Sequence, residues 1–221
     1  MSQSKAAQRS TLILVPTELE VRHFERQRGF DSVASEVEQC GFGPIASAAR
    51  TAQLIAKVMP SRVILAGIAG SYDVEHCEIG QAYAFRTVSI YGVGAGTGAQ
   101  HTPIKEMGFV QWPPIVDTVG LAVPKHVDNQ ESLLTCCAAS GSAVDVKDRR
   151  RCFPNAVAED MEGFGVALAC EISGAELTII RGISNVAGER DTVNWKVGEA
   201  IAAAWQLLQQ LDLPGVMESQ A

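Results

Sequence analysis

Residues 44–70, PIASAARTAQLIAKVMPSRVILAGIAG, decide the fold. Residues 45–58 are rich in alanine, leucine and isoleucine and contain few helix breakers, which predicts a helix. Pro44 suits the first turn of that helix, because its missing N–H would have no helical partner there. The following run, Arg62–Ala66, predicts a buried strand that ends in the glycine-rich segment Gly67–Gly70.

The alternation of apolar strands and helices continues on both sides of this stretch. The other predicted elements are strands at Thr11–Val15, Val33–Glu38, Gln81–Ile90 and Leu177–Ile180, and helices at Asp160–Ser173 and Val197–Leu211. Buried strands that alternate with helices predict one α/β domain with three layers, α/β/α, around a mixed, largely parallel central sheet. We place this domain at 11–212, between a disordered N-terminal tail at 1–10 and a C-terminal tail at 213–221.

Ligands of such sheets bind beyond the carboxyl ends of the strands. Four polar or glycine-rich loops are expected at that rim: Pro16–Glu20, Gly67–Tyr72, Gly92–Gly98 and Ser184–Asp191. The segment Gln100–Lys147 contains four prolines and shows no clear periodicity, so we expect it to be an irregular excursion over the substrate face.

The composition excludes several classes of function. Lys and Arg number 18 against 25 Asp and Glu in 221 residues, which opposes nucleic-acid binding. The longest apolar stretch, Val63–Gly70, is far shorter than the roughly 20 residues of a membrane span, so we expect a cytoplasmic protein that does not bind membranes. Six cysteines without a C-x-x-C pair and four scattered histidines predict neither a metal site nor a cofactor.

Glycine occupies every second position from Gly92 to Gly98, which superficially suggests a dinucleotide-binding loop. That fingerprint requires a helix directly after the glycines, and the next residues, Gln100–Pro103, open no helix. A flexible loop is therefore favoured, and a nicotinamide-dependent oxidoreductase is the weakest alternative.

Two motifs contain candidate chemistry. In EDME, 159–162, the first two carboxylates fit the positive end of the predicted helix, whereas Glu162 lies one turn deeper and can accept hydrogen bonds from ribose hydroxyls. In RGISN, 181–185, Asn185 follows a strand, where it is equally consistent with a turn residue. Asp191 is as consistent with capping the next helix as with assisting a leaving group.

Five segments in order resemble one superfamily. They are PTELEV (16–21), CGFGPIASA (40–48), GIAGS (67–71), FPNAVAEDMEGFGVA (153–167) and RGISNVAGERD (181–191). Together they resemble the purine nucleoside phosphorylases and nucleosidases, and within that superfamily they are most similar to the futalosine hydrolases, relatives of methylthioadenosine/S-adenosylhomocysteine nucleosidases. The resemblance spans about 11–211 and is poor over 100–147.

The resemblance implies a nucleoside phosphorylase-like fold, a small-molecule nucleoside as substrate, and a homo-oligomer. It makes Glu20 the carboxylate that activates the attacking water, and it places Asn185 where adenine-specific nucleosidases have an aspartic acid that protonates the leaving base. Asp191 is the candidate helper of that step. The substrate-binding residues that it implies are Gly70, Ser71, Phe153 against the base, Met161 under the ribose, and Glu162 on its hydroxyls.

Asn185 favours a 6-oxopurine as the leaving group. Hypoxanthine presents acceptors at both N7 and O6, whereas adenine presents an acceptor at N7 and a donor at its 6-amino group. The two N–H donors of an asparagine amide match the hypoxanthine edge. Together with this preference, the resemblance implies that futalosine is hydrolysed to hypoxanthine in menaquinone biosynthesis. The carboxylate tail of futalosine needs a donor, for which His101, Lys105 and Arg86 are candidates.

Three alternatives remain open at this stage. Glu18 and Glu20 would repel a phosphate dianion, which favours water as the nucleophile, although Arg22 and Arg86 leave phosphorolysis open. A methylthioadenosine nucleosidase is opposed by Asn185. A non-catalytic nucleoside-binding protein would have no need of Glu20 and Glu162 together.

Overall fold

The computed structural model describes residues 11–211, so the two predicted tails lie outside the described residues. The strands are β1 (Thr11–Val15), β2 (Val37–Gln39), β3 (Arg62–Ser71), β4 (Ala82–Tyr91), β5 (Gly94–Ala95), β6 (Thr102–Pro103), β7 (Thr118–Gly120), β8 (Asn129–Cys136), β9 (Ala156–Asp160) and β10 (Glu176–Val186). Eight of them form one mixed sheet in the order β10-β4-β8-β9-β3-β1-β2, with β7 paired to β4, and β5 pairs with β6 separately.

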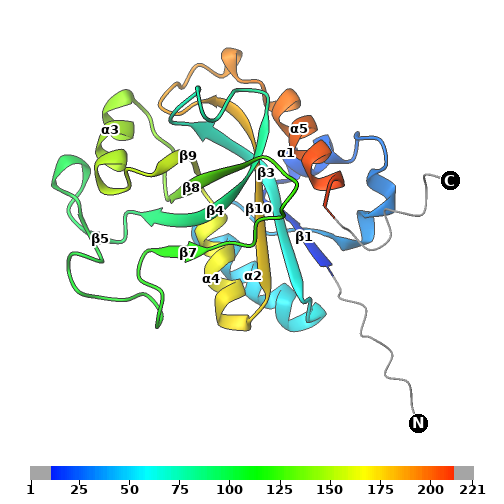
Figure 1. Cartoon of the computed structure of the whole chain (residues 1–221), viewed down its shortest axis with the longest axis horizontal. Coiled ribbons are helices and arrows are strands. Elements are labelled where there is room, and N and C mark those ends of the chain that lie inside the picture. Colours follow the sequence, from blue (N-terminus) through cyan, green and yellow to red (C-terminus); the bar gives the residue numbers. More distant parts are fainter. Residues whose placement is uncertain (1–10, 212–221) are drawn as a thin grey trace, which may run out of the picture.

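The helices cover both faces of this sheet. They are α1 (Glu18–Phe24), α2 (Pro44–Val58), α3 (Ala143–Cys152), α4 (Gly163–Ser173) and α5 (Val197–Gln209), with short 3-10 turns at 30–32, 34–36, 98–100 and 192–194. α2 packs against α4, and α1 packs against α5, which lies on β10 and β3 (Figure 1). The sequence-based expectation of three α/β/α layers is confirmed.

Strand β1 shows why the sheet is buried on both faces. Leu12 and Leu14 belong to the core that contains Phe164 of α4. Ile13 and Val15 belong to the other core, which contains Phe24 of α1. Because successive side chains of a strand point to opposite faces, a sheet between two helical layers requires an unbroken apolar run.

Strand β3 closes the central strands into a ring. Along one edge it pairs with β10, and along the other it pairs with β1 near its start and with β9 at its last two residues. Because β10 also pairs with β4, and β4 leads through β8 to β9, the five strands β3, β9, β8, β4 and β10 form a closed circuit. The C-terminal ends of β3, β9 and β10 consequently meet at one rim.

Several local expectations were wrong. The rim loop Pro16–Glu20 contains the start of α1, where Thr17 Oγ1 accepts from the Glu20 N–H (3.3 Å) and Glu20 Oε2 accepts from the Thr17 N–H (3.1 Å). This reciprocal pair is a capping box, whose T-x-x-E signature is present in the sequence. The strand expected at Val33–Glu38 is confined to Val37–Gln39, after the turn at 34–36.

The largest correction concerns residues 100–162. The expected excursion contains strand β8, which lies inside the central sheet, and the beginning of α3. The helix expected from Asp160 begins at Gly163, because Glu159 and Asp160 are the last residues of β9. Only Asp160 reaches the helix start, where its Oδ2 accepts from the Gly163 N–H at 2.9 Å.

Candidate active site

A cavity of about 330 Å³ lies where the C-terminal ends of β3, β9 and β10 meet α1. Of the sequence-predicted site residues, it is lined by Glu20, Gly70, Met161, Glu162 and Asn185. Its other lining residues are Thr17, Leu19, Phe42, Ile68, Ala69, Ala139, Ser140, Glu159, Asp160, Ser184, Gly188, Arg190 and Trp195. Carboxylates from the first helix and from the strand-to-helix junction after β9 therefore share one cavity with the strand-end asparagine.

Glu20 is buried and rigidly held. Its Oε2 accepts from Thr17 Oγ1 at 2.6 Å, and its Oε1 accepts from the Ile68 N–H at 3.1 Å. Burial raises the pKa of Glu20 above its ordinary value, and the nearby Arg181 guanidinium and these hydrogen bonds only partly oppose the rise. Glu20 therefore takes up a proton more readily than an exposed glutamate does.

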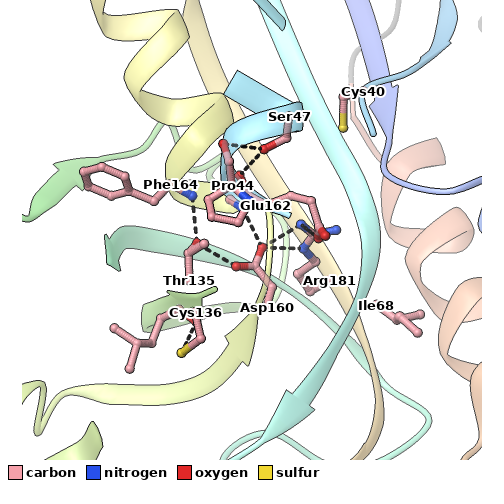
Figure 2. Close-up of polar contacts among 12 residues, drawn as sticks. Cys40, Pro44, Ser47, Ile68, Thr135, Cys136, Asp160, Glu162, Phe164 and Arg181 are labelled. Atoms are coloured by element: carbon pink, nitrogen blue, oxygen red, sulfur yellow. Dashed lines mark hydrogen bonds and ion pairs between the residues drawn. The ribbon is translucent and has the colours of Figure 1, made fainter. Parts of the chain in front are cut away.

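Arg181 is fully buried next to the cavity and connects its carboxylates. Its Nη2 donates to Asp160 Oδ2 at 2.6 Å and to Glu162 Oε2 at 3.4 Å, and Thr135 holds the other Asp160 oxygen at 2.6 Å (Figure 2). Its Nη1 is buried without a hydrogen-bond partner among the described residues. The buried carboxylates of Asp160, Glu162 and Glu20 thus share the single positive charge of Arg181. The RGISN motif did not indicate this role of Arg181.

Glu162 is anchored at both oxygens. Oε1 accepts from the Gly43 N–H at 3.1 Å, and Oε2 faces Arg181. Burial raises the pKa of Glu162 to about 7, with Arg181 lowering it and Asp160 raising it further. Glu162 directly precedes α4 and Gly43, whose φ is +83°, directly precedes α2, so this hydrogen bond joins the starts of the two helices.

Gly67 is required by this packing. A Cβ on Gly67 would collide with Arg181 Nη1 and would lie 2.7 Å from Glu20 Oε1 and 3.1 Å from Pro16 Cδ. The bare backbone of β3 therefore lets the guanidinium and the Glu20 carboxylate approach the same point of the sheet. Gly67 lies within β3 and not in a loop after it, so the absence of its side chain serves close packing.

Asn185 has a fixed side-chain amide. Its Nδ2 donates to the Val186 carbonyl at 2.8 Å, and its Oδ1 accepts from Ser184 Oγ at 2.8 Å. The second N–H of the amide has no partner in the part of the chain that the structure describes. One donor therefore remains for a ligand in the cavity.

Three sequence-predicted residues do not line this cavity. Phe153 follows α3 and lines a separate cavity of about 290 Å³. Ser71 is buried, and its hydroxyl accepts from the Asp73 N–H at 3.1 Å. Asp191 is exposed and caps the turn at 192–194 by accepting from the Val193 N–H at 3.1 Å. The structure thus separates these three from Glu20, Glu162 and Asn185.

Among residues 11–211, Arg190 is the only lysine or arginine that lines the cavity. Its guanidinium lies 5.2 Å from the centre of the Trp195 ring, which also lines the cavity. The expected tail donors His101, Lys105 and Arg86 are not among the lining residues. Within residues 11–211 no cluster of His, Cys, Asp and Glu could hold a metal ion, and none of the described helices is long and apolar enough to cross a membrane.

Curated relatives show what the chain is similar to. No protein-family model matches it. Futalosine hydrolase from Streptomyces coelicolor is 32% identical over 182 residues, which cover 79% of this chain and 75% of that protein. Futalosine hydrolase from Acidothermus cellulolyticus is 31% identical over 148 residues, which cover 64% of this chain and 60% of that protein.

Solved structures share the fold. The 5'-methylthioadenosine/S-adenosylhomocysteine nucleosidase from Neisseria meningitidis, in complex with methylthio-immucillin-A, matches with a TM-score of 0.74 and 17% identity over 90% of this chain and 96% of that chain. Futalosine hydrolase of Helicobacter pylori matches with a TM-score of 0.71 and 17% identity over 90% of this chain and 95% of that chain. The nucleoside phosphorylase-like fold expected from the sequence is thereby confirmed.

Proposed function

Because the chain belongs to the futalosine hydrolase family, we propose that it hydrolyses the N-ribosidic bond of futalosine and releases hypoxanthine, a step of menaquinone biosynthesis. The observation that supports this most strongly is that Glu20, Glu162 and Asn185, from three separate segments, line one cavity. A nucleosidase needs carboxylates at the sugar and a hydrogen-bond donor at the departing base, and the cavity contains both.

Glu20 and Glu162 act on the sugar. Cleavage of the bond between C1′ and the purine nitrogen develops positive charge on the ribose, and nearby carboxylates stabilise that charge more in the transition state than in the ground state. Glu162 accepts hydrogen bonds from the ribose hydroxyls, above Met161. Glu20 takes a proton from water as the water oxygen bonds to C1′, and its raised pKa makes it a stronger base than an exposed glutamate.

Asn185 acts on the leaving base. The electrons of the broken bond pass to the purine, which becomes an anion with excess charge at N7 and O6. The anion takes up a proton from solvent to become hypoxanthine, and Glu20 returns to solvent the proton that it took from water. The free N–H of the Asn185 amide donates to that edge, while Ser184 and the Val186 carbonyl keep the amide in place. A donor that is already oriented when charge develops is the arrangement that lowers the barrier.

Water is the nucleophile that the cavity favours. In the described part of the chain, four carboxylates and one cationic side chain, Arg190, line it. Arg22 is exposed and pairs with Glu18 at 2.6 Å, and Arg86 is exposed outside the cavity. A phosphate dianion would therefore enter a site of like charge.

Arg190 and Trp195 form the subsite for the rest of the substrate. Futalosine carries a carboxylate on its tail, and Arg190 is the one lining cation that can pair with it. No hydrogen bond or ion pair occupies the Arg190 guanidinium among residues 11–211, so it is available for that role. Trp195 presents its indole ring to the same cavity and can pack against the apolar part of the tail.

We also propose a homo-oligomer with the cavity near the subunit contact. Leu19 and Phe42 line the cavity and yet are 59% and 63% exposed, and Ile45, three residues after Phe42 in α2, is 83% exposed. An exposed apolar cluster of this kind is typical of an interaction surface. Sedimentation of the purified protein should show a dimer or larger species, whereas a monomer at micromolar concentration would contradict this.

The activity is tested with purified protein and a substrate panel. Futalosine should yield hypoxanthine, measured by coupled oxidation, at the same rate with and without phosphate. Methylthioadenosine should yield adenine much more slowly. Absence of hypoxanthine release would contradict the proposed function, and release only in the presence of phosphate would show that the chain is a phosphorylase.

A further inference from the structure

Glu159 is a buried carboxylate that the reaction above does not use. It lies at the end of β9, is 5% exposed, and lines the cavity. Its position on the sheet is specific: Gly70 of β3 pairs with Glu159 on one side and with Asn185 on the other. Directly paired residues of neighbouring strands share a face of the sheet, so the two side chains flank Gly70 about two strand spacings, roughly 10 Å, apart.

Gly70 places no side chain on the sheet between them. A Cβ at this position would lie 3.5 Å from Asn185 Nδ2 and 3.4 Å from the Ala187 backbone. Gly70 therefore contributes only backbone to the wall between Glu159 and Asn185, with Ala187 packed beside it. A planar purine ring can therefore lie over Gly70, with one end of its six-membered edge toward each of the two side chains.

The hydrogen bonds of Glu159 leave one oxygen available. Oε2 accepts from Tyr72 OH (2.7 Å), Ser140 Oγ (2.6 Å) and Arg149 Nη1 (2.7 Å). Oε1 accepts only from the Ser140 N–H, at 2.7 Å, among the described residues. A carboxylate oxygen accepts two hydrogen bonds readily, so Oε1 can take one more donor from the cavity.

The Ser140 N–H also bears on the choice of base. Ser140 lines the cavity, and its backbone donor would otherwise be free to bond a ring-nitrogen acceptor. Because Glu159 Oε1 takes that N–H, the cavity wall at this point presents an acceptor in place of a donor. Arg149 pairs with the carboxylate, which compensates the cost of burying the charge.

The resulting pattern distinguishes the two classes of purine. Along its edge a 6-oxopurine presents acceptors at N7 and O6 and then a donor, the N1–H. Adenine presents an acceptor at N7, a donor at its amino group, and an acceptor at N1. Asn185 offers a donor and Glu159 an acceptor, which complements the 6-oxopurine and opposes the lone pair of adenine N1 with a carboxylate.

We propose that Glu159 is a specificity-determining residue that accepts a hydrogen bond from N1–H of a 6-oxopurine held over Gly70, opposite Asn185. The inference rests on the proposed nucleosidase function and deepens it. It assigns to Glu159 the discrimination between hypoxanthine and adenine that the Asn185 donor alone would provide only in part. A carboxylate acceptor is worth about 1.5–3 kcal/mol, which is roughly a tenfold to hundredfold preference.

The test measures the dissociation constants of hypoxanthine and adenine by calorimetry with the full chain. Wild-type protein should bind hypoxanthine at least tenfold more tightly than adenine. Glu159→Gln keeps the shape but supplies a donor, so the ratio should move toward adenine by tenfold or more. Glu75→Gln, which removes a charge from an exposed loop after β3, is the matched control and should keep the wild-type ratio.

A second measurement needs no variant. 1-Methylhypoxanthine lacks the N1–H and should bind the wild-type protein at least tenfold more weakly than hypoxanthine does. Equal binding of hypoxanthine and 1-methylhypoxanthine would overturn the inference. So would a hypoxanthine-to-adenine affinity ratio that is unchanged in a folded Glu159→Gln protein. Hypoxanthine release from futalosine by wild-type protein is measured first. Failure of the Glu159 inference can then be distinguished from failure of the proposed function.

Discussion

Two buried carboxylate–arginine clusters border the cavity, and they differ in their balance of charge. The ribose cluster contains Glu20, Asp160 and Glu162 around Arg181, which is fully buried. The base cluster contains Glu159 and Arg149, with Ser140 and Tyr72 as neutral donors. In the first, three acids share one cation, and in the second a single acid has a cation of its own.

The difference in balance corresponds to a difference in chemistry. In the ribose cluster burial raises the pKa of Glu20 above its ordinary value and, together with the Asp160 and Glu20 carboxylates, brings that of Glu162 to about 7, so Glu162 can gain and lose a proton near neutral pH. In the base cluster four donors surround the Glu159 carboxylate. We infer that proton transfer belongs to the ribose cluster and recognition of the base to the other.

Removing a carboxylate of the ribose cluster should have the largest effect on activity. We expect Glu20→Gln and Glu162→Gln each to lower kcat for futalosine by about 10²–10⁴-fold, the usual loss for a general acid–base group. Glu18→Gln is the control, because Glu18 lies on the same helix but is exposed and pairs with Arg22. Full activity in either buried variant would remove that residue from the mechanism.

Removing the shared cation should have the largest effect on stability. Arg181→Met leaves three buried carboxylates without a cation, and we expect a loss of about 3–5 kcal/mol in the free energy of unfolding. Arg149→Met leaves one carboxylate that keeps its hydrogen bonds to Tyr72 and Ser140, so a loss of about 1–3 kcal/mol is expected. Urea unfolding measures both, and an equal or reversed order would contradict the comparison.

Glu162 should make stability depend on pH. Its pKa is about 7 in the folded chain against an ordinary value of 4.5, so the folded state binds the proton more tightly than the unfolded state does. The stabilisation is therefore complete below pH 4.5 and is lost as the pH rises through 7. From pH 5 to pH 8, the free energy of unfolding should decrease more for the wild type than for Glu162→Gln. An equal decrease in both proteins would refute this.

The smallest effect is expected outside both clusters. Arg190→Ala should raise KM for futalosine by about tenfold, since the variant loses a charge-assisted contact at an exposed position. Its KM for inosine, which lacks the carboxylate tail, should stay within about twofold of the wild-type value. An equal rise for both nucleosides would assign Arg190 a structural role and leave the tail subsite unassigned.

Much of the fold could be predicted from the sequence because strands buried on both faces, such as β1 and β3, are unbroken apolar runs. Strand β8 could not, because the prolines of the segment before it obscure the pattern. The capping box at Thr17 and Glu20 was visible as T-x-x-E and was overlooked because Pro16 suggested a loop. Pro16 favours a loop and T-x-x-E favours a helix start, and the packing of the folded chain determines which of the two forms.

The sequence predicted the site residues that local patterns mark. It did not predict the charged residues that are buried with an opposite charge from a distant part of the chain. Glu162 stood out because it lies beside Gly163, and Asn185 stood out because it follows the predicted strand Leu177–Ile180. Arg181 and Glu159 did not, because nothing local shows that distant opposite charges meet them. Phe153 was assigned to the base by resemblance, yet it lies at another cavity.

The most direct test of this account is a crystal structure of the full chain soaked with hypoxanthine. The base should lie over Gly70, with its N7 and O6 edge toward the Asn185 amide, its N1 toward Glu159, and the carboxylates of Glu20 and Glu162 facing the empty ribose space. Hypoxanthine bound in the cavity beside Phe153, or bound with its N1 edge away from Glu159, would contradict it.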